Sequence, residues 1–350
     1  MAFPTKPSAY LLGSNGPVHA LAYSSSPGTY ILAGSSDRSI RLYNPSPASS
    51  SRSHNGTDVL EGRLIQTYSA HGYEVLSIAV SSGNESFVSS GGDRAVFLWD
   101  VSTGVTTRRF GGNIHGHTGQ INCVSFAGAG DSLIVSGSFD TTARIWDVKS
   151  NSVKPIQVLD NARDAITSIV VRGPEVITGS VDGRVRSYDI RMGTCTADVI
   201  GASVTSLDIT KDGNALLVGT LDSKLRLMDR KNGTCLKAYD DPTWRNEELR
   251  VQSLLAKREK YVIVGDEMTA GLGGREGRVL AWDVLSGKLA ATITIPWGPA
   301  GYESKKKVIG KDGKEKIRNN VMSCMAWRDG GWGDQFCVAG TSGVVTVFDT

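Results

Sequence analysis

Two stretches of the sequence each combine a histidine, a serine, an aspartate and a tryptophan at similar spacing. The imidazole, hydroxyl and carboxylate are the groups of a hydrolytic triad. The same groups, together with the indole, can instead satisfy one another in a buried hydrogen-bond chain. Because the set recurs in register at two places, we favour the structural interpretation. The sets are His71, Ser89, Asp93 and Trp99, and His117, Ser136, Asp140 and Trp146.

Motifs for catalysis or cofactor binding are missing from the sequence. It contains no HExxH, GxSxG or Walker A element, and Gly271 to Gly277 (GLGGREG) has Glu276 where a nucleotide loop would need its third glycine. The five cysteines form no CxxC pair, which argues against a disulfide framework and a thiolate metal site. We therefore expect no enzymatic activity, no cofactor and no metal.

Seven segments with a common turn position reveal an internal repeat. An aspartate holds that position in five segments (37, 93, 140, 182 and 222), and Glu276 and Ser342 hold it in the last two. Each segment is a polar turn that leads into an apolar strand, with further apolar runs before and after it, so each unit has four strands. The segments are SSDRSIRLYN, GGDRAVFLWD, SFDTTARIWD, SVDGRVRSYD, TLDSKLRLMD, GREGRVLAWD and GTSGVVTVFD.

This repeat predicts the fold class. Four strands per unit, with intervals of 47, 42 and 40 residues between the closing positions 100, 147, 189 and 229 of the second to fifth units, are typical of WD repeats. We predict an all-β, seven-bladed WD-repeat β-propeller with four antiparallel strands per blade, formed as a single domain by residues 1–350. The seventh unit has three strands of its own, so we expect the N-terminal stretch Tyr10 to Leu12 to supply the fourth and close the ring. We expect the propeller to be monomeric.

Several segments resemble one subfamily of WD-repeat proteins. Tyr68 to Leu76 (YSAHGYEVL), Ser90 to Gly104 (SGGDRAVFLWDVSTG) and Gly179 to Gly193 (GSVDGRVRSYDIRMG) are similar to the mitogen-activated protein kinase organiser subfamily. Leu159 to Val171 and Leu221 to Asp229 agree with it. The resemblance implies a non-enzymatic scaffold that gathers kinase-cascade components in the cytoplasm and associates with the spliceosome in the nucleus during pre-mRNA splicing.

A second functional hypothesis rests on the fourth repeat. Val176 to Arg191 (VITGSVDGRVRSYDIR) resembles the motif by which WD-repeat substrate receptors dock on a cullin-type ubiquitin ligase, and it ends in Asp189 and Arg191. Ser187 departs from the motif, which is normally apolar there. The ordinary needs of a WD repeat explain most of these residues, so this reading is the alternative.

Three insertions interrupt the repeat at residues 45–58, 266–275 and 296–318. The third is basic, with a local charge of seven minus three, or +4. Its lysines could contact RNA phosphates or an acidic protein, whereas a solvated loop is the simpler interpretation. The candidate residues of this basic loop are Lys305, Lys306, Lys307 and Lys311.

Binding of protein partners is expected on the turns at one rim, where the backbone is fixed and side chains are free. The overall charge of +3 gives no reason to expect a polyanionic partner. No apolar run is long enough for a signal peptide or a membrane span, so we expect an intracellular protein without membrane contact. Recurrent arginines at positions 41, 144, 186 and 226 are expected to pack between blades, with their heads on carbonyls or water. The candidates for protein binding are Tyr73, Glu74, Arg94, Gln120, Arg163, Asp164, Arg184 and Arg191.

Overall fold

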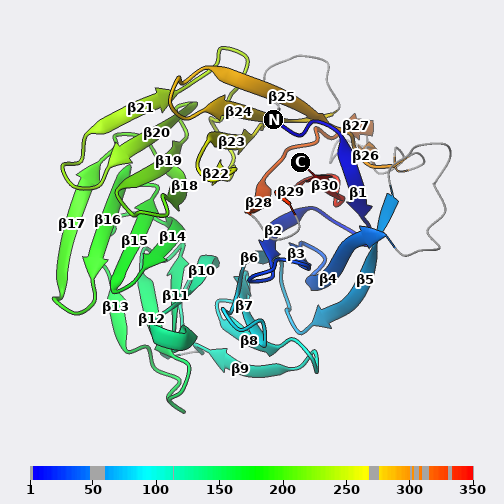
Figure 1. Ribbon diagram of the computed structural model, residues 1–350. Helices are drawn as coiled ribbons and strands as arrows, with labels where there is room; N and C mark the ends of the chain where they lie inside the picture. The colour runs from blue at the N-terminus through cyan, green and yellow to red at the C-terminus, as the bar shows by residue number, and fades with distance from the viewer. Residues whose placement is uncertain are drawn as a thin grey trace.

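The computed structural model forms a ring of β-sheets (Figure 1). It describes residues 3–47, 60–112, 114–267, 276–299, 302, 307–309, 315–329 and 333–349. The regular structure of these residues is almost entirely β-strand, and Ala129–Asp131 forms a short 3₁₀ turn. No helix in the described ranges is long and apolar enough to cross a membrane.

The first three blades follow one another along the chain, and each contains four consecutive antiparallel strands. Blade one contains β2 (Val18–Tyr23), β3 (Ile31–Ser35), β4 (Ser39–Pro47) and β5 (Leu60–Ser69). Blade two contains β6 (Val75–Val80), β7 (Ser86–Gly91), β8 (Val96–Asp100) and β9 (Thr106–Phe110). Blade three contains β10 (Ile121–Ala127), β11 (Leu133–Ser138), β12 (Ala143–Asp147) and β13 (Gln157–Leu159).

The next three blades repeat this arrangement. Blade four contains β14 (Ile166–Arg172), β15 (Glu175–Ser180), β16 (Arg184–Asp189) and β17 (Thr194–Val199). Blade five contains β18 (Val204–Ile209), β19 (Ala215–Thr220), β20 (Lys224–Asp229) and β21 (Cys235–Tyr239). Blade six contains β22 (Ser253–Ala256), β23 (Tyr261–Gly265), β24 (Gly277–Asp283) and β25 (Leu289–Ile295).

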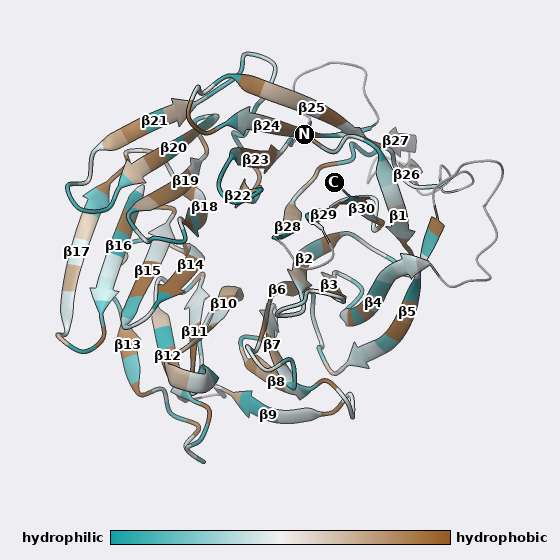
Figure 2. Ribbon diagram, in the orientation of Figure 1, coloured by the Kyte–Doolittle hydropathy of each residue, from teal (hydrophilic) through white to brown (hydrophobic). Residues whose placement is uncertain are grey.

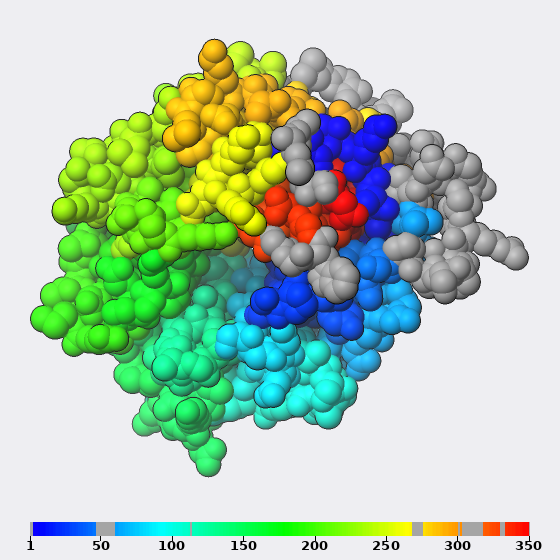
Figure 3. Space-filling view, in the orientation of Figure 1, coloured from blue at the N-terminus to red at the C-terminus, as the bar shows by residue number. Residues whose placement is uncertain are grey.

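The seventh blade joins the two ends of the chain. It contains β28 (Cys324–Arg328), β29 (Gln335–Ala339) and β30 (Val345–Asp349), and its outer strand is β1 (Pro7–Leu11), which pairs antiparallel with β30. Figure 3 shows the N-terminal segment in blue beside the C-terminal segment in red. β1 also makes a short parallel pairing with β5 of blade one, at Ala9–Leu60 and Tyr10–Glu61. The predicted propeller closed by an N-terminal strand is confirmed.

The tight turn between the second and third strands of a blade explains the constant spacing in the sequence. In blade three, both Thr142 N–H and Thr142 Oγ1–H donate to the carboxylate of Asp140. The residue after the turn aspartate adopts a positive φ, for example 60° at Arg94 and 74° at Gly183. The carboxylate satisfies the backbone of the turn, which explains why an aspartate holds this position in the first five hairpins.

The hydrophobic core is divided among the junctions between blades. Seven buried clusters are present in the described residues, and each joins the facing sheets of two neighbouring blades. At the junction of blades six and seven, Phe3 from the N-terminus packs edge-on against Tyr261 and also contacts Phe336. Hydrophobic residues lie mainly within strands, whereas many connecting turns are hydrophilic (Figure 2). Each blade therefore depends on two neighbours for its core.

The insertions differ in how far they depart from the blades. Residues 45–47 continue strand β4, and residues 48–59 lie outside the described part of the chain. Asp266 and Glu267, at the start of the second insertion, are each 1% exposed. The third insertion contains a small hairpin of β26 (Lys307–Ile309) and β27 (Glu315–Ile317).

Deletion of residues 1–14 is expected to destabilise the protein severely. It removes β1, exposes β30 as a free edge and takes the buried side chains of Phe3, Tyr10 and Leu11 out of two cores. Burial of one such side chain stabilises a protein by about 1.5–3 kcal/mol, so we expect a loss of at least 4 kcal/mol in the free energy of unfolding. Urea denaturation of both proteins measures this loss.

The matched control is Lys6→Ala, since Lys6 precedes β1 and its side chain is exposed. We expect a change of less than about 0.5 kcal/mol for this variant. A deletion variant as stable as the full chain would contradict closure of the ring by β1.

Candidate functional site

The two histidine sets form continuous hydrogen-bond chains in blades two and three. In blade two, His71 Nδ1 lies 2.6 Å from Asp93 Oδ2, and His71 Nε2 lies 2.7 Å from Ser89 Oγ. Trp99 Nε1–H donates to the same serine oxygen at 2.8 Å. The chain in blade three has the same order, from Trp146 through Ser136 and His117 to Asp140, with distances of 2.8 to 3.0 Å.

The chemistry of the aspartate at the end of the chain decides which atom donates each hydrogen bond. A carboxylate only accepts, so Nδ1–H of His117 donates to Asp140. Burial lowers the pKa of His117, so its ring is neutral and Nε2 accepts from Ser136 Oγ–H. Burial by itself would raise the pKa of Asp140, but hydrogen bonds from His117, Thr142 and Thr118 outweigh burial and hold this pKa well below its usual value.

These chains have the connectivity of a Ser–His–Asp triad but offer no access to a substrate. Ser89 and Ser136 are each 0% exposed, and each hydroxyl is occupied by a histidine and a tryptophan. A nucleophile has to reach its substrate, so these serines act as structural links. Nor do three or more potential metal-binding side chains of His, Cys, Asp or Glu gather anywhere in the described residues.

Blades without the histidine hold the turn aspartate with an arginine four residues later. Arg41 pairs with Asp37 at 2.8 Å, and Arg186 pairs with Asp182 at 2.7 Å. Arg226 pairs with Asp222 in the same way. The expectation that all four recurrent arginines meet carbonyls or water was wrong for these three, because the turn carboxylate is the nearest buried acceptor. Arg144 donates to the His115 carbonyl, as expected, but it also lies 4.0 Å from the carboxylate of Asp140.

The buried chains fix one rim of the propeller, and four of the predicted binding residues share one depression on it. Tyr73, Glu74, Arg94 and Gln120 line a depression of about 480 Å³ between blades one, two and three, together with Arg38. Tyr73 is 64% exposed, and the side chains of Arg94 and Gln120 are also exposed. Glu74 lies 3.9 Å from His19, and Gln120 donates to Asn122 Oδ1 at 3.2 Å, whereas Tyr73 and Arg94 extend from the turns as exposed side chains.

The remaining candidates lie apart from this depression. Arg163 and Asp164 are exposed on the loop between blades three and four, and Arg163 N–H donates to Asp182 Oδ2 at 3.0 Å. Arg184 follows on the next turn of the same rim. Arg191 lies on the opposite rim, on the turn after β16, where it lines a groove beside Ile190. The structure therefore divides the eight predicted residues between two rims.

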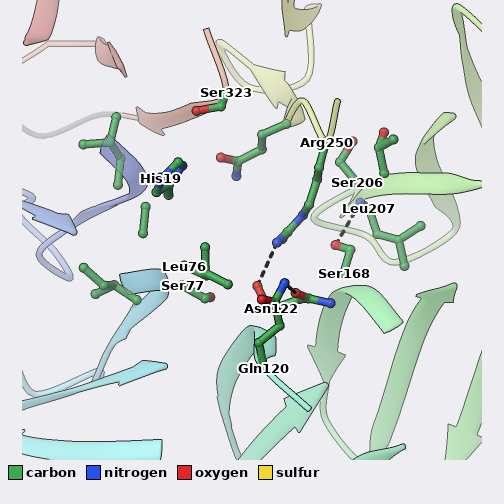
Figure 4. A pocket seen from close by; sticks show the side chains of 15 residues that line it. His19, Leu76, Ser77, Gln120, Asn122, Ser168, Ser206, Leu207, Arg250 and Ser323 are labelled. Atoms are coloured by element: carbon green, nitrogen blue, oxygen red, sulfur yellow. Dashed lines mark hydrogen bonds between the residues drawn. The ribbon is translucent and has the colours of Figure 1, made fainter. Parts of the chain in front are cut away.

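The central channel is a feature that the sequence did not reveal. A cavity of about 300 Å³ in it is lined by residues from all seven blades. In blades one to five, a β-bulge at the start of the innermost strand breaks the pairing register. The bulged residues His19, Leu76 and Asn122 line the cavity (Figure 4), and so does Thr205. A bulge leaves no reliable signal in a repeat sequence, so these positions were missed.

Phe139 was also missed. It is 62% exposed on the turn of blade three, next to Gly119 at the edge of the depression. The signal was present, because a bulky aromatic stands where Ser36 and Gly92 occupy the same turn in blades one and two. Of the predicted basic loop, Lys305, Lys306 and Lys311 lie outside the described residues, and Lys307 begins β26.

Comparison with known proteins places the chain in a family. The WD domain, G-beta repeat model matches residues 5–44, 62–100 and 108–147. Human WD repeat domain-containing protein 83 is 38% identical over 271 residues, 77% of each chain. The Dictyostelium discoideum homolog of that protein is 30% identical over 312 residues, covering 81% of this chain and 87% of the homolog. The chain belongs to the WD repeat domain-containing protein 83 family.

Membership of this family confirms the resemblance to the mitogen-activated protein kinase organiser subfamily. The repeat register agrees too, because the three matched ranges end at Asn44, Asp100 and Asp147, the last residues of the first three segments. The chain is thus a WD-repeat propeller of the kind that serves as a scaffold for protein interactions.

Substitution of Asp140 by Asn is expected to lower stability in a pH-dependent way. The folded-state pKa of Asp140 is depressed, so its contribution is present above the unfolded value of about 3.9 and is lost as pH falls through the folded pKa. At pH 7 we expect a loss of about 2 kcal/mol in the free energy of unfolding, because hydrogen bonds to the carboxylate are weakened. Urea denaturation at pH 7 and at pH 3 measures the difference, which should shrink at the lower pH.

Asp160→Asn is the matched control, since Asp160 is exposed on the loop that leads to blade four. We expect it to change the free energy of unfolding by less than about 0.5 kcal/mol at both pH values. A difference between wild type and Asp140→Asn that is the same at both pH values would show that the carboxylate charge does not stabilise the fold.

Proposed function

We propose that this protein is a non-enzymatic scaffold that gathers kinase-cascade components in the cytoplasm and joins the spliceosome in the nucleus during pre-mRNA splicing. The observation that carries the proposal is family membership over more than three quarters of the chain. The resemblance to the kinase organiser subfamily supplies the two processes and the two compartments. Its partners would be proteins, with RNA contact at most peripheral through the lysines of the third insertion.

The rim supports a role in binding proteins. An exposed Tyr and Arg at fixed positions are typical of residues that dominate interface energies. Tyr73 and Arg94 combine these properties in one depression, and Phe139 adds a second exposed aromatic at its edge. A partner could bury these side chains without any change in the blades.

The buried serines support the non-enzymatic part of the proposal. The hydroxyls most like a nucleophile, Ser89 and Ser136, are closed off beneath the rim. Their histidines and aspartates are engaged in holding the turns. The serine, histidine and aspartate side chains of blades two and three therefore stabilise the turns that form the rim.

Affinity purification tests the scaffold function. The tagged chain is purified separately from cytoplasmic and nuclear fractions of its own cells, and bound proteins are identified by mass spectrometry. We expect several kinase-cascade proteins from the cytoplasm and spliceosomal proteins from the nucleus, because a scaffold holds several partners at once. Asp140→Asn, which leaves the rim side chains in place, should recover the same proteins if it is folded. Recovery of no specific partner from either fraction would contradict the proposal.

The groove around Arg191 favours a second candidate function, as substrate receptor of a cullin-type ubiquitin ligase. Arg191 is exposed, and its N–H donates to Asp189 Oδ1 at 2.8 Å, so the end of the motif is rigid and accessible. The groove beside it has a volume of about 570 Å³ and includes Phe126 and Val171. A ligase adaptor could therefore engage this rim while the opposite rim holds a client.

Arg191→Ala is expected to abolish adaptor binding with no change in melting temperature, because its side chain is exposed. Co-purification of the adaptor with each variant is the measurement. Arg184→Ala is the control, since Arg184 belongs to the same blade but to the opposite rim. Failure of the adaptor to co-purify with the wild type, or equal loss with both variants, would rule out this candidate.

A further inference from the structure

One arginine extends across the central channel. Arg250 precedes β22 of blade six, and its Nη1–H donates to the backbone carbonyl of Asn122 in blade three at 2.8 Å. Figure 4 shows this side chain reaching between the blades toward Asn122. A guanidinium has five N–H donors, and the Asn122 carbonyl is the only acceptor for Arg250 within the described residues. Most of its hydrogen-bonding capacity faces the cavity.

The charge of Arg250 has no counter-ion in the channel. No Asp or Glu lines the cavity, whose polar groups are the hydroxyls and amides of side chains such as Ser77, Gln120 and Gln252. No carboxylate of the described residues lies within ion-pair distance of Arg250, in contrast to the recurrent arginines of the blades. His19 is the other ionisable group of the lining, and it faces Glu74 at 3.9 Å. The channel thus presents an uncompensated cation among neutral donors and acceptors.

The loop that carries Arg250 is held rigidly. Glu267 is 1% exposed, and its carboxylate accepts the N–H groups of residues 247, 248 and 249 at 2.9 to 3.1 Å. Trp244 is buried and donates to the carbonyl of Gly265 at 3.0 Å, while Val251 is fully buried. Arg250 therefore projects from a fixed backbone, so little entropy is lost when it binds a ligand.

We infer that the channel is a binding site for an acidic side chain of a partner protein, with Arg250 as the group that recognises its carboxylate. A carboxylate matches the planar guanidinium and accepts two parallel hydrogen bonds from it. Phosphorylated peptides are generally read by clusters of arginines, and this cavity has a single one. Its volume of about 300 Å³ fits one side chain and a few waters. This inference rests on the proposed scaffold function.

The surroundings of the channel favour a peptide segment over a free anion. Gln120 lines both the channel and the depression on the rim, so the two cavities adjoin. The depression adds Arg38 and Arg94 against one carboxylate, Glu74, and it offers the exposed ring of Tyr73. An extended acidic segment could lie along the rim and place one carboxylate beside Arg250.

Fluorescence anisotropy with a defined peptide tests the site. The probe is a fluorescein-labelled octapeptide of alternating Glu and Gly, and its counterpart has Gln in place of Glu. We expect saturable binding of the Glu peptide to the wild-type chain and at least tenfold weaker binding of the Gln peptide. Arg250→Gln should weaken binding of the Glu peptide at least tenfold, and Arg250→Lys, which keeps the charge, should weaken it less.

Arg245→Gln is the matched control. Arg245 lies on the same loop, has a side chain that is 51% exposed, and pairs with Glu247, so its loss removes the same charge without touching the channel. We expect this variant to bind the peptide within threefold of the wild type. Equal weakening by Arg245→Gln and Arg250→Gln would show that binding depends only on the overall charge of the protein, and it would overturn the inference. An absence of peptide binding to the wild type would overturn it as well. Binding of citrate to the wild type without any binding of the Glu peptide would indicate a free-anion site and overturn the inference too.

Affinity purification with Arg250→Gln separates this inference from the scaffold function. Melting temperatures within a few degrees of the wild type establish that the variant is folded. If the wild type recovers its partners and Arg250→Gln loses at least one of them, while Arg245→Gln keeps them all, the inference is supported. Recovery of the full set by Arg250→Gln would overturn the inference and leave the scaffold function standing. Failure of the wild type to recover any partner would instead contradict the scaffold function.

Discussion

Pairing of β1 with β30 is the interaction on which the rest of the structure depends. No blade holds a complete core of its own, because each of the seven clusters is shared by two neighbouring blades. A ring of such units has no end, so opening it at one place removes a neighbour from two blades at once. The parallel contact of β1 with β5 ties this closure to blade one as well. The four residues of β1 that pair with β30 therefore hold the two ends of the chain together and close the ring.

Beneath the rim, two different side-chain chemistries perform one task. Asp140 is held by a neutral histidine that is linked through Ser136 to Trp146, whereas Asp182 is held by the charged Arg186. Burial alone would raise the pKa of both aspartates, and in both the hydrogen-bond partner lowers it instead. In either case the N–H groups of the turn donate to an ionised carboxylate. This explains why the turn geometry is constant although the side chain that holds the carboxylate varies.

Sequence reasoning reached the strands, the turns and the closure of the ring, and it missed the strand bulges and the contacts of long side chains. The register of the turn aspartate predicted the hairpins, and the recurrence of the His71 and His117 sets predicted their hydrogen-bond chains. The partners of Arg41 and Arg186 were not foreseen, because spacing along one strand does not reveal which acceptor a long side chain will reach. Arg250 gave no signal at all. It lies in a loop outside the repeat, and its contact with Asn122 joins residues 128 positions apart.

The channel links ring closure to recognition. Side chains around it also join neighbouring inner strands: Ser77 Oγ accepts from Val124 N–H, Ser168 Oγ from Leu207 N–H, and Gln252 Oε1 from Met325 N–H, all at 3.0 to 3.1 Å. The same polar groups therefore set the spacing of the blades and line the cavity that Arg250 enters. A ligand that engages Arg250 would contact a surface built by all seven blades at once. Its binding would stabilise the closed ring over any opened form, since an opened ring no longer brings blades three and six to the same distance.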